Sequence, residues 1–574
     1  MKSETKNCQN CKKDFIIEPD DFSFYEKIKV PPPTFCPECR SQRRMSWRNV
    51  RNLYRHKCKA PEHDEVIIST YSPEKIFNIY DSKYWWSDKY DSSLYGMDYD
   101  FSRPFFLQFA ELLKRTPLPN ISNINPVNTD YANMTIESKD CYFVFSSNKN
   151  ENCSYSEGIN DCQNSIDILS SHNNNFLHES IDCINCFNVA FGIKANECID
   201  SMFLYDCKNC SNCFGCWNLR NKKYFIFNKQ YTKEEYKKTI ESFNLDSYLQ
   251  FEKIKNSYKE KLQNAIRKFA DISKSENVSG NNIEFSNDCH NSFDIFKANN
   301  SSYVWRFLRN GGSDNYDVTI GTKPELCYEG NGVGAAYNFK FGVATDNTSN
   351  SFYAHTCVSS CNYLFGCVGL KGKSYCILNR QYTKEQYEEL IPKIIKHMSD
   401  MPYIDSKGRV YKYGEFFPSE LSPFAYNETI AQEYFPLTKE QALEQGYKWK
   451  DKEERNYSID IHTEDIPDSI SDISDTDILN KVIECSHKGT CNQQCTEAFK
   501  IIPEELSFYR RMNLPLPRLC PNCRHYERLA QRNPMKLWHR GCMKPGCTNT
   551  FETSYAPERQ EIVYCEKCYQ GEVY

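Results

Sequence analysis

The chain has 574 residues and a formal net charge of −5 at pH 7, from 71 lysines and arginines against 76 aspartates and glutamates. This length is too great for one hydrophobic core and predicts about three to five domains, and the slightly acidic balance excludes a protein that is basic throughout, so any nucleic-acid contact must come from a local patch. No segment has the roughly 18 consecutive apolar residues of a membrane-spanning helix, and the first residues contain no apolar signal segment, so we expect a cytoplasmic protein without a membrane contact.

The sequence contains 30 cysteines. A disulfide framework is typical of small secreted domains, whereas this chain is long and has no recognisable signal peptide. We therefore interpret the cysteines as reduced thiols, many of which bind metal.

The first predicted element, residues 1–57, is a metal-binding module. Cys8 and Cys11 form one short pair, and Cys36 and Cys39 form a second pair 25 residues further along the chain. Zn²⁺ prefers four tetrahedral thiolate or imidazole ligands, and two such pairs supply them. The stretch between the pairs is hairpin-like, and the proline after Cys36 favours the start of a helix. This order predicts a treble-clef fold around one zinc ion.

Residues 58–118 are predicted to form a degenerate second ribbon followed by an aromatic-rich segment. Its possible ligands are Cys58, His63 and Asp81, but Tyr84 stands in the fourth position and tyrosine is not a usual zinc ligand. The alternative is that hydrophobic side chains have replaced the metal. Metal binding is expected to be weak here.

The middle of the chain is predicted to contain parallel β-solenoid blocks at residues 119–229 and 276–380. Cys141, Cys162 and Cys183 are 21 residues apart. A period near 20 is typical of repeats in which equivalent side chains stack in the interior. The scarcity of leucine and the frequent Asn-bearing turns favour β-solenoid coils over leucine-rich repeats, with cysteine as a small interior side chain.

A helix is predicted after each block. The segment Phe214–Tyr236 recurs as Phe365–Tyr387, displaced by 151 positions, so the blocks are copies of one another. Thr232 and Thr383 are suited to cap these helices, because each precedes a first turn that carries glutamate. The remaining predicted segments are a helical one at 230–275, a helical and aromatic capping segment at 381–450 and a mobile acidic linker at 451–484.

Four cysteines in the first block stand at every third position, Cys207, Cys210, Cys213 and Cys216. This spacing approaches that of an iron–sulfur loop. Three interpretations remain open: an iron–sulfur cluster, a further zinc ion, or thiols packed inside the solenoid. We favour the packed thiols.

The carboxy-terminal residues 485–541 repeat the first module at a constant offset of 484, so that Cys36 recurs as Cys520. Cys8 has no counterpart at this offset, and we assign the neighbouring Cys491 as the first ligand. Residues 542–574 add a further zinc ribbon. The predicted ligands of about three zinc ions are Cys8, Cys11, Cys36, Cys39, Cys491, Cys495, Cys520, Cys523, Cys542, Cys547, Cys565 and Cys568.

Both ends resemble the zinc-ribbon (treble-clef) domain family, through C-x2-C, F, F-Y, P and C-P-x-C-R in this order. Similar modules occur at the ends of long zinc-ribbon proteins of ultrasmall bacterial lineages. The resemblance covers roughly the first 60 and the last 90 residues. It implies metal binding and this fold at the two ends, and it carries no activity.

Arginines follow the second cysteine pair of each module. Their planar forks suit phosphate oxygens, and a rigid zinc module would present them at low entropic cost. The alternatives are a solvated face, pairing with nearby acids, or a protein-docking surface. The residues expected to bind nucleic acid are Arg40, Arg43, Arg44, Arg48, Arg51, Arg524, Arg528, Arg532 and Arg540.

These elements predict a mainly β protein with helical insertions, in which terminal treble-clef modules flank two solenoid blocks. The leading hypothesis is a zinc-binding scaffold that contacts nucleic acid, RNA among the candidates, through its arginine helices. The alternatives are a protein-interaction scaffold that uses the solenoid surface and a carbohydrate-binding or carbohydrate-active solenoid. No catalytic motif such as a P-loop, GxSxG or HExxH is present, so we assign no catalytic residues.

Overall fold

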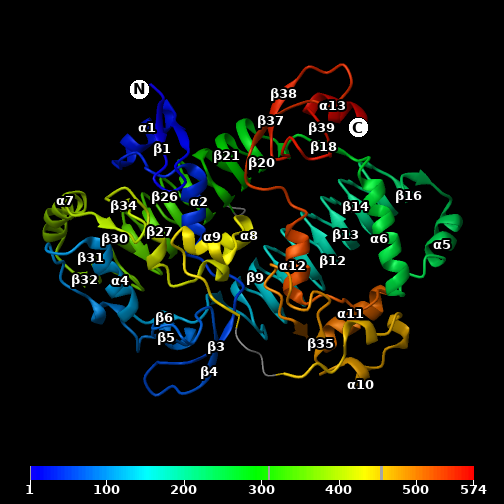
Figure 1. Ribbon diagram of the computed structural model, residues 1–574, viewed down its shortest axis with the longest axis horizontal. Coiled ribbons are helices and arrows are strands. Elements are labelled where there is room, and N and C mark those ends of the chain that lie inside the picture. The colour runs from blue at the N-terminus through cyan, green and yellow to red at the C-terminus, as the bar shows by residue number, and fades with distance from the viewer. Residues whose placement is uncertain (1, 308–310, 453–456) are drawn as a thin grey trace.

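The computed structural model describes residues 2–307, 311–452 and 457–574. Two parallel β-solenoids form the centre of the molecule and lie side by side (Figure 1). The mainly β architecture with helical insertions and a cysteine cluster at each end confirms the predicted fold class. No helix in the described ranges has both the length and the apolar character needed to cross a bilayer.

The first solenoid is an 11-stranded sheet and the second a 14-stranded sheet. The strands of the first are β7 (Asn123–Ile124), β8 (Asn133–Ile136), β9 (Tyr142–Asn148), β10 (Ser154–Glu157), β11 (Ile166–Leu169), β12 (Asn175–Ile181), β13 (Phe187–Ile193), β14 (Ile199–Tyr205), β15 (Ser211–Trp217), β16 (Lys223–Ile226) and β17 (Lys229–Gln230). Those of the second are β19 (Ile272–Ser273), β20 (Glu276–Glu284), β21 (Asn287–Phe296), β22 (Ala298–Ser302), β23 (Trp305–Phe307), β24 (Gly312–Ser313), β25 (Tyr316–Thr322), β26 (Tyr328–Gly334), β27 (Lys340–Thr345), β28 (Thr348–Ser349), β29 (Phe352–His355), β30 (Cys361–Phe365), β31 (Ser374–Ile377) and β32 (Arg380–Gln381).

One coil of the first solenoid is 12 residues long. Phe187 pairs with Ile199, and Ile199 pairs with Ser211. The predicted coil of about 20 residues is therefore wrong. Within each coil, every third side chain points inward. Cys162 and Cys183 are both fully buried, because their spacing of 21 is a multiple of three. It is not a multiple of twelve, so they lie on different sides of the coil.

The residue before each inward position adopts left-handed backbone angles, as at Asn173, Asn185, Asn209 and Asn221. Asparagine and aspartate tolerate this conformation better than other non-glycine residues. Their side chains also stack from coil to coil: the Asn173 amide donates to Asn185 at 3.2 Å, and the Asn209 amide donates to Asn221 at 2.7 Å. The frequent asparagines are therefore a requirement of the coil geometry.

Helices cap and cover the solenoids. Thr232 and Thr383 each accept a hydrogen bond from the helix they precede and complete a capping box, as predicted. The helices that follow them are α5 (Lys233–Glu241) and α7 (Lys384–Asp400), and α6 (Tyr248–Leu262) lies along the first solenoid (Figure 1). The remaining helices of this part of the fold are α4 (Phe105–Arg115), α8 (Ile430–Tyr434), α9 (Lys439–Glu444) and α10 (Asp475–Ile478).

The terminal modules repeat one pattern of hairpin, helix and helix. The first contains β1 (Glu4–Asn7), β2 (Asp14–Ile17), α1 (Pro19–Ile28) and α2 (Pro37–Met45), and the last contains β35 (Ile483–Glu484), β36 (Ala498–Phe499), α11 (Pro503–Met512) and α12 (Pro521–Leu529). The ribbons that follow them contain β3 (Tyr54–Lys57), β4 (Val66–Ser69) and α3 (Ser82–Trp86), and β37 (Trp538–Gly541), β38 (Thr550–Thr553), β39 (Ile562–Tyr564) and α13 (Glu566–Val573). Short pairings add β5 (Ile79–Tyr80) to β6 (Leu118–Pro119), β18 (Ile266–Lys268) to β39, and β33 (Tyr403–Ile404) to β34 (Val410–Tyr411).

The two modules are exchanged between the solenoids. Helix α2 of the amino-terminal module packs on β25 and β26 of the second solenoid, and α12 of the carboxy-terminal module packs on β10, β11 and β12 of the first (Figure 1). Phe24 of α1 stacks on Tyr316 of the second solenoid with 3.9 Å between the ring centres. Each end of the chain therefore covers the solenoid that is more distant in sequence.

The described part of the acidic segment, 457–484, is not a free linker. Ile466, Ile470 and Ile478 are buried in a core shared with α6 and α11. Residues 453–456 of this segment lie outside the described ranges. The overall composition of this segment is acidic and predicted a linker, but isoleucines spaced among the acidic residues pack into the core.

Candidate metal centres and the arginine contacts

The first tetracysteine cluster consists of Cys8, Cys11, Cys36 and Cys39, whose sulfur atoms all lie within 4.8 Å of one another. Cys11 Sγ is 3.8 Å from Cys36 Sγ, and the Cys36 amide donates to Cys8 Sγ at 3.2 Å. Hydrogen bonds with Cys36 and Cys39 lower the pKa of the Cys8 thiol. Helix α2 begins directly after Cys36, so its positive end stabilises thiolates. Four converging thiols of this kind fit a metal ion.

The carboxy-terminal cluster differs from the prediction in one residue. It consists of Cys485, Cys495, Cys520 and Cys523. Cys485 follows β35 directly, as Cys8 follows β1, and its sulfur accepts a hydrogen bond from the Cys520 amide at 3.2 Å. The predicted ligand Cys491 lies in the longer loop between the first two ligands.

Cys491 nevertheless lies beside this cluster. Its sulfur is 3.7 Å from Cys523 Sγ, and with His487 it forms a three-residue group at the same place. The constant offset of 484 missed Cys485 because an insertion separates the first two ligands. Its position directly after β35, equivalent to that of Cys8 after β1, identifies Cys485 only once the structure is known.

The third cluster consists of Cys542, Cys547, Cys565 and Cys568. Cys547 Sγ is 3.9 Å from Cys565 Sγ. Burial acts to raise the pKa of Cys565, but hydrogen bonds, among them one from the Asn549 amide, outweigh it and lower this pKa to about 6. The predicted ligand set of this ribbon is brought together.

The second amino-terminal ribbon keeps its fold and brings together two of its three predicted ligands, Cys58 and His63, but not Asp81. The Asp81 amide donates to Cys58 Sγ at 3.3 Å, and at the equivalent place the Cys565 amide donates to Cys542 Sγ at 3.3 Å. The Asp81 carboxylate instead accepts from the Lys83 amide and caps α3. Glu65, which the sequence did not suggest, joins Cys58 and His63 in a three-residue group. The Tyr84 ring packs against His63 and Tyr80, in agreement with the aromatic alternative.

Cys207, Cys210, Cys213 and Cys216 occupy successive inward positions of one coil and are at most 1% exposed. Each thiol donates to the backbone carbonyl two residues earlier, at 3.5, 3.3, 3.5 and 3.3 Å respectively. Burial raises the pKa of the Cys207 thiol. A protonated, donating thiol is what the packed interpretation requires.

The arginines of α2 are buried in ion pairs with the second solenoid. Arg40 and Arg44 are both 1% exposed and lie 2.9 Å from the two oxygens of Asp317. Arg44 also contacts Glu329 at 3.1 Å, and Arg43 contacts Glu329 at 2.6 Å. Coulombic attraction to Asp317 outweighs burial and raises the pKa of Arg40. No phosphate reaches side chains held in this way.

The arginines of α12 repeat this arrangement on the first solenoid. Arg524 and Arg528 are 3% and 1% exposed and lie 3.3 and 2.9 Å from the oxygens of Asp167. Arg528 also contacts Glu179 at 3.1 Å. These arginines are displaced from Arg40 and Arg44 by 484 positions, and their acidic partners from Asp317 and Glu329 by 150. The arginine helix and the acidic solenoid surface that it contacts are therefore both duplicated in this chain.

The predicted nucleic-acid interface is therefore wrong for most of its residues. Seven of the nine arginines are less than 10% exposed. Arg51 pairs with Glu157 at 3.2 Å, and Arg532 pairs with Asp294 at 2.7 Å. The seven are Arg40, Arg43, Arg44, Arg48, Arg51, Arg524 and Arg528, while Arg532 and Arg540 are partly exposed. Their partners come from solenoid segments far away in the sequence, where the acids recur at equivalent coil positions.

No protein-family model and no curated protein matches this chain. Among solved structures it is similar to one described as a "putative acetyltransferase from Desulfovibrio desulfuricans G20", at 9% identity over 50% of this chain and 86% of that one. The TM-score of this match is 0.11, which supports no conclusion about fold or function.

Proposed function

We propose that this chain is a scaffold in which three zinc-binding tetracysteine modules fasten two β-solenoids together. The observation that carries the proposal is the exchange of the modules, because the first two metal clusters each lie at the start of a helix, α2 or α12, whose arginines are ion-paired with the opposite solenoid. A structural metal ion would hold each helix in place within its module, and the arginines of the helix would hold the module against the solenoid.

Zinc is the metal that the ligand chemistry favours. Each cluster offers four sulfur atoms, and a closed tetrahedral set of thiolates is typical of structural zinc sites. The proposal includes a cytoplasmic location, because thiolate ligands persist in a reducing compartment.

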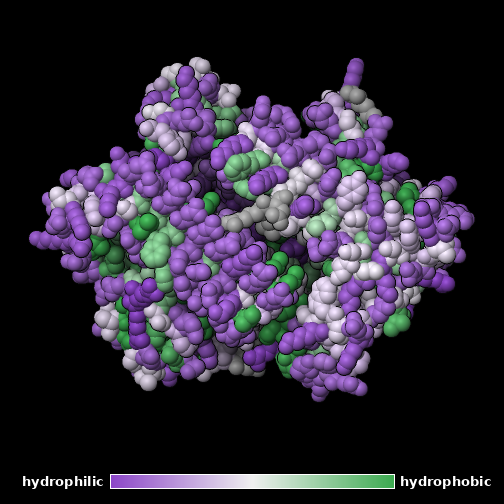
Figure 2. Space-filling model, turned by 180° about the vertical axis from the view of Figure 1, so that it is seen from behind, coloured by the Kyte–Doolittle hydropathy of each residue, from purple (hydrophilic) through white to green (hydrophobic). Residues whose placement is uncertain are grey.

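We further propose that the scaffold binds a protein on the uncovered side of the first solenoid. Phe187 and Ile199 are neighbours in the strand register and remain 44% and 45% exposed. The ring of Phe176 packs against Phe187 and is itself covered by Arg511 of α11, so the patch borders the carboxy-terminal module. The space-filling view from behind shows a mostly hydrophilic surface, interrupted by hydrophobic patches (Figure 2). Contiguous apolar surface favours a protein partner over a phosphate backbone.

The test uses a photo-crosslinking amino acid at position 187 or 199 of the full-length protein, with position 94 as a control, because Leu94 is an exposed apolar residue outside the first solenoid. We expect a protein adduct at 187 and 199 that forms equally at low and high salt and is lost in Phe187→Ser. An RNA adduct, or binding that weakens steeply with salt, would instead support the nucleic-acid hypothesis. Equal crosslinking at position 94 would overturn the proposed surface.

A further inference from the structure

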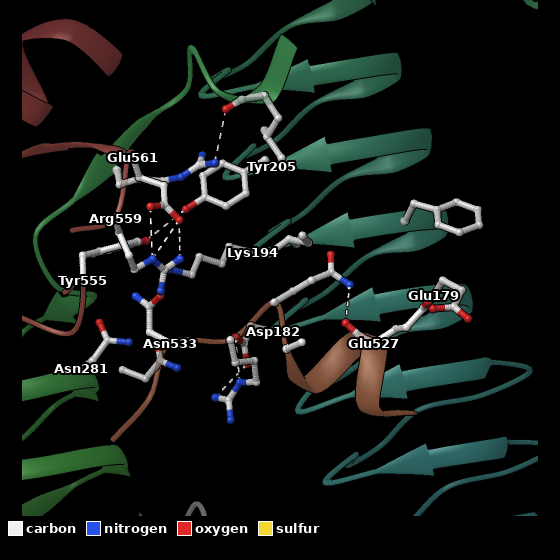
Figure 3. Close-up of a pocket in the computed structure, with 18 of the residues that line it drawn as sticks. Glu179, Asp182, Lys194, Tyr205, Asn281, Glu527, Asn533, Tyr555, Arg559 and Glu561 are labelled. Atoms are coloured by element: carbon white, nitrogen blue, oxygen red, sulfur yellow. Dashed lines mark hydrogen bonds and ion pairs between the residues drawn. The ribbon is translucent and has the colours of Figure 1, made fainter. Parts of the chain in front are cut away.

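A cavity of about 480 Å³ lies between the two solenoids, α6, α12 and the carboxy-terminal ribbon (Figure 3). Its volume is in the range that encloses a small organic ligand. Lys194, Tyr205, Arg559 and Glu561 point toward one another at one end (Figure 3). The aromatic side chains of its lining are Phe191, Phe203, Tyr205, Tyr258, Phe293, Trp305, Tyr434 and Tyr555.

Two buried donor groups at this end, Arg267 Nη1 and the Tyr258 hydroxyl, have no acceptor among the described residues. Arg267 is 8% exposed and its guanidinium lies 3.7 Å from the centre of the Tyr205 ring. Its Nη2 donates to the Leu262 carbonyl at 3.3 Å, whereas Nη1 has no hydrogen-bond partner among the described residues. Tyr258 is 5% exposed, and its hydroxyl also lacks a partner there. Buried donors are nearly always satisfied in folded proteins, so these two point to a missing acceptor.

The nearby charged groups are engaged with one another. Both carboxylate oxygens of Glu561 accept from Arg559 Nε at 3.1 Å, and Lys194 is ion-paired with Asp271. Burial raises the pKa of Tyr258 well above its ordinary value, so its hydroxyl keeps its proton and is able to donate. The free hydrogen-bonding capacity at this end is therefore donor capacity.

The other half of the molecule is filled at the equivalent place. Trp47 is 1% exposed and packs on Phe417 with 5.0 Å between the ring centres, where the open half has Gln531. The solenoid coils of the two halves also differ in the size and polarity of their side chains at this place. At four lining positions of the open half, Asp182, Lys194, Gln531 and Glu561 replace Gly332, Ala344, Trp47 and Phe77 of the closed half. The half that contains the cavity therefore differs from the other half both in its empty volume and in these polar side chains.

We propose that this cavity binds a small organic anion that carries a flat ring. Its carboxylate or phosphate group accepts hydrogen bonds from Arg267 Nη1 and the Tyr258 hydroxyl, and its ring packs against the aromatic walls. The cavity sits beside the α12 contacts, so a bound anion adds a small-molecule site to the scaffold. This inference does not depend on the identity of the metal or of the protein partner.

Binding is tested by isothermal titration calorimetry on the full-length, metal-loaded protein. The probes are nucleoside monophosphates and hydroxybenzoates, with adenosine, hydroxybenzyl alcohol and inorganic phosphate as the uncharged and ringless comparisons. We expect one of the two ring anions to bind at least tenfold more tightly than its neutral analogue and than inorganic phosphate. The stronger class identifies the acidic group as phosphate or carboxylate.

Two variants test the site itself. Arg267→Gln removes the free donor, and Gln531→Trp fills the cavity with the side chain of the closed half. Each is expected to weaken binding at least tenfold, with unchanged metal content and elution volume as the check on folding. Arg511→Gln is the matched control, because Arg511 also stacks on a ring, that of Phe176 at 3.6 Å, but lies outside the cavity. The proposal is overturned if no ring anion binds at millimolar concentration, if neutral analogues bind equally, or if both variants bind like the parent protein.

Discussion

Asp167 and Asp317 lie at equivalent positions of the two solenoids, and each is ion-paired with two buried arginines from the module at the opposite end of the chain. Both residues have left-handed backbone angles, with φ of 60° and 57°. This conformation places each carboxylate on the outer side of its coil, facing the helix. A single carboxylate on each solenoid is thus the centre of each contact between a module and a solenoid.

The first prediction concerns these two aspartates. Asp317→Asn leaves Arg40 and Arg44 with less compensating charge in a buried place, and removal of one partner from such a pair costs about 3–5 kcal/mol of unfolding free energy. Urea unfolding measures the loss, and hydrogen exchange locates it. Asp317→Asn should expose α2, and Asp167→Asn should expose α12. The control is Asp314→Asn, whose partly exposed pair with Lys27 contributes about 0–1 kcal/mol. An equal, small effect of all three variants would contradict this account.

The second prediction concerns the metal count. We expect three zinc ions per chain by elemental mass spectrometry, since three tetracysteine clusters are present in the described residues. Cys485→Ser should lower the count to two, because Cys485 belongs to the four-sulfur set. Cys491→Ser and Cys58→Ser should leave it at three. If Cys491→Ser lost one zinc ion and Cys485→Ser kept all three, the ligand assignment made from the constant offset would be correct instead.

Chelation should also weaken the contacts between modules and solenoids. A strong chelator removes the ions that organise the starts of α2 and α12, so the thermal unfolding midpoint should fall and zinc should restore it. The interior thiols provide the comparison: Cys210→Ala should leave the zinc content unchanged. A chelator-insensitive midpoint would show that the modules hold together without metal.

The third prediction concerns pH. Burial raises the pKa of Glu433 to about 7, from an ordinary value of 4.5. A carboxyl with a higher pKa in the folded state binds its proton more tightly there, so its contribution to stability is present below pH 4.5 and is lost as the pH rises to about 7. Glu433→Gln removes this dependence and keeps a hydrogen-bonding group near His525 Nε2, which lies 3.3 Å from the carboxylate.

Urea unfolding at several pH values compares this variant with the parent protein. Glu433→Gln should be more stable than the parent at pH 8, by on the order of 1–3 kcal/mol, and the difference should shrink toward pH 5. The exposed Glu444→Gln should show no such trend. A variant that is less stable than the parent at pH 8 would mean that the charged form of Glu433 is favoured.

The fourth prediction concerns the exchange of modules. A protease site inserted after Lys450 allows the chain to be cut between the second solenoid and the carboxy-terminal module. The fragments should still co-elute at physiological salt, because Arg524 and Arg528 are buried against the first solenoid. They should separate when Asp167→Asn is combined with a chelator. Immediate separation of the unaltered fragments would contradict the observed docking.

The sequence predicted those features that depend on local spacing. Short cysteine pairs define a zinc knuckle within a few residues, and Thr232 caps its helix through its own neighbours. The coil length was missed because the inward period of three is not specific to 12-residue coils. The role of Arg528 was missed because its partner Glu179 lies 349 residues away in the sequence. A basic helix has the same composition whether it faces phosphate or a buried acid, so only the tertiary structure distinguishes the two.

The exchange of the modules also sets the order of events during synthesis. Glu179 leaves the ribosome 349 residues before Arg528, which at about 5–20 residues per second is a delay on the order of 20–70 s. Throughout this interval the first solenoid presents an acidic, aromatic face without its cover. The first solenoid is therefore covered only after the module at 485–541 has been made. Products truncated before this module should be bound by chaperones or degraded by proteases.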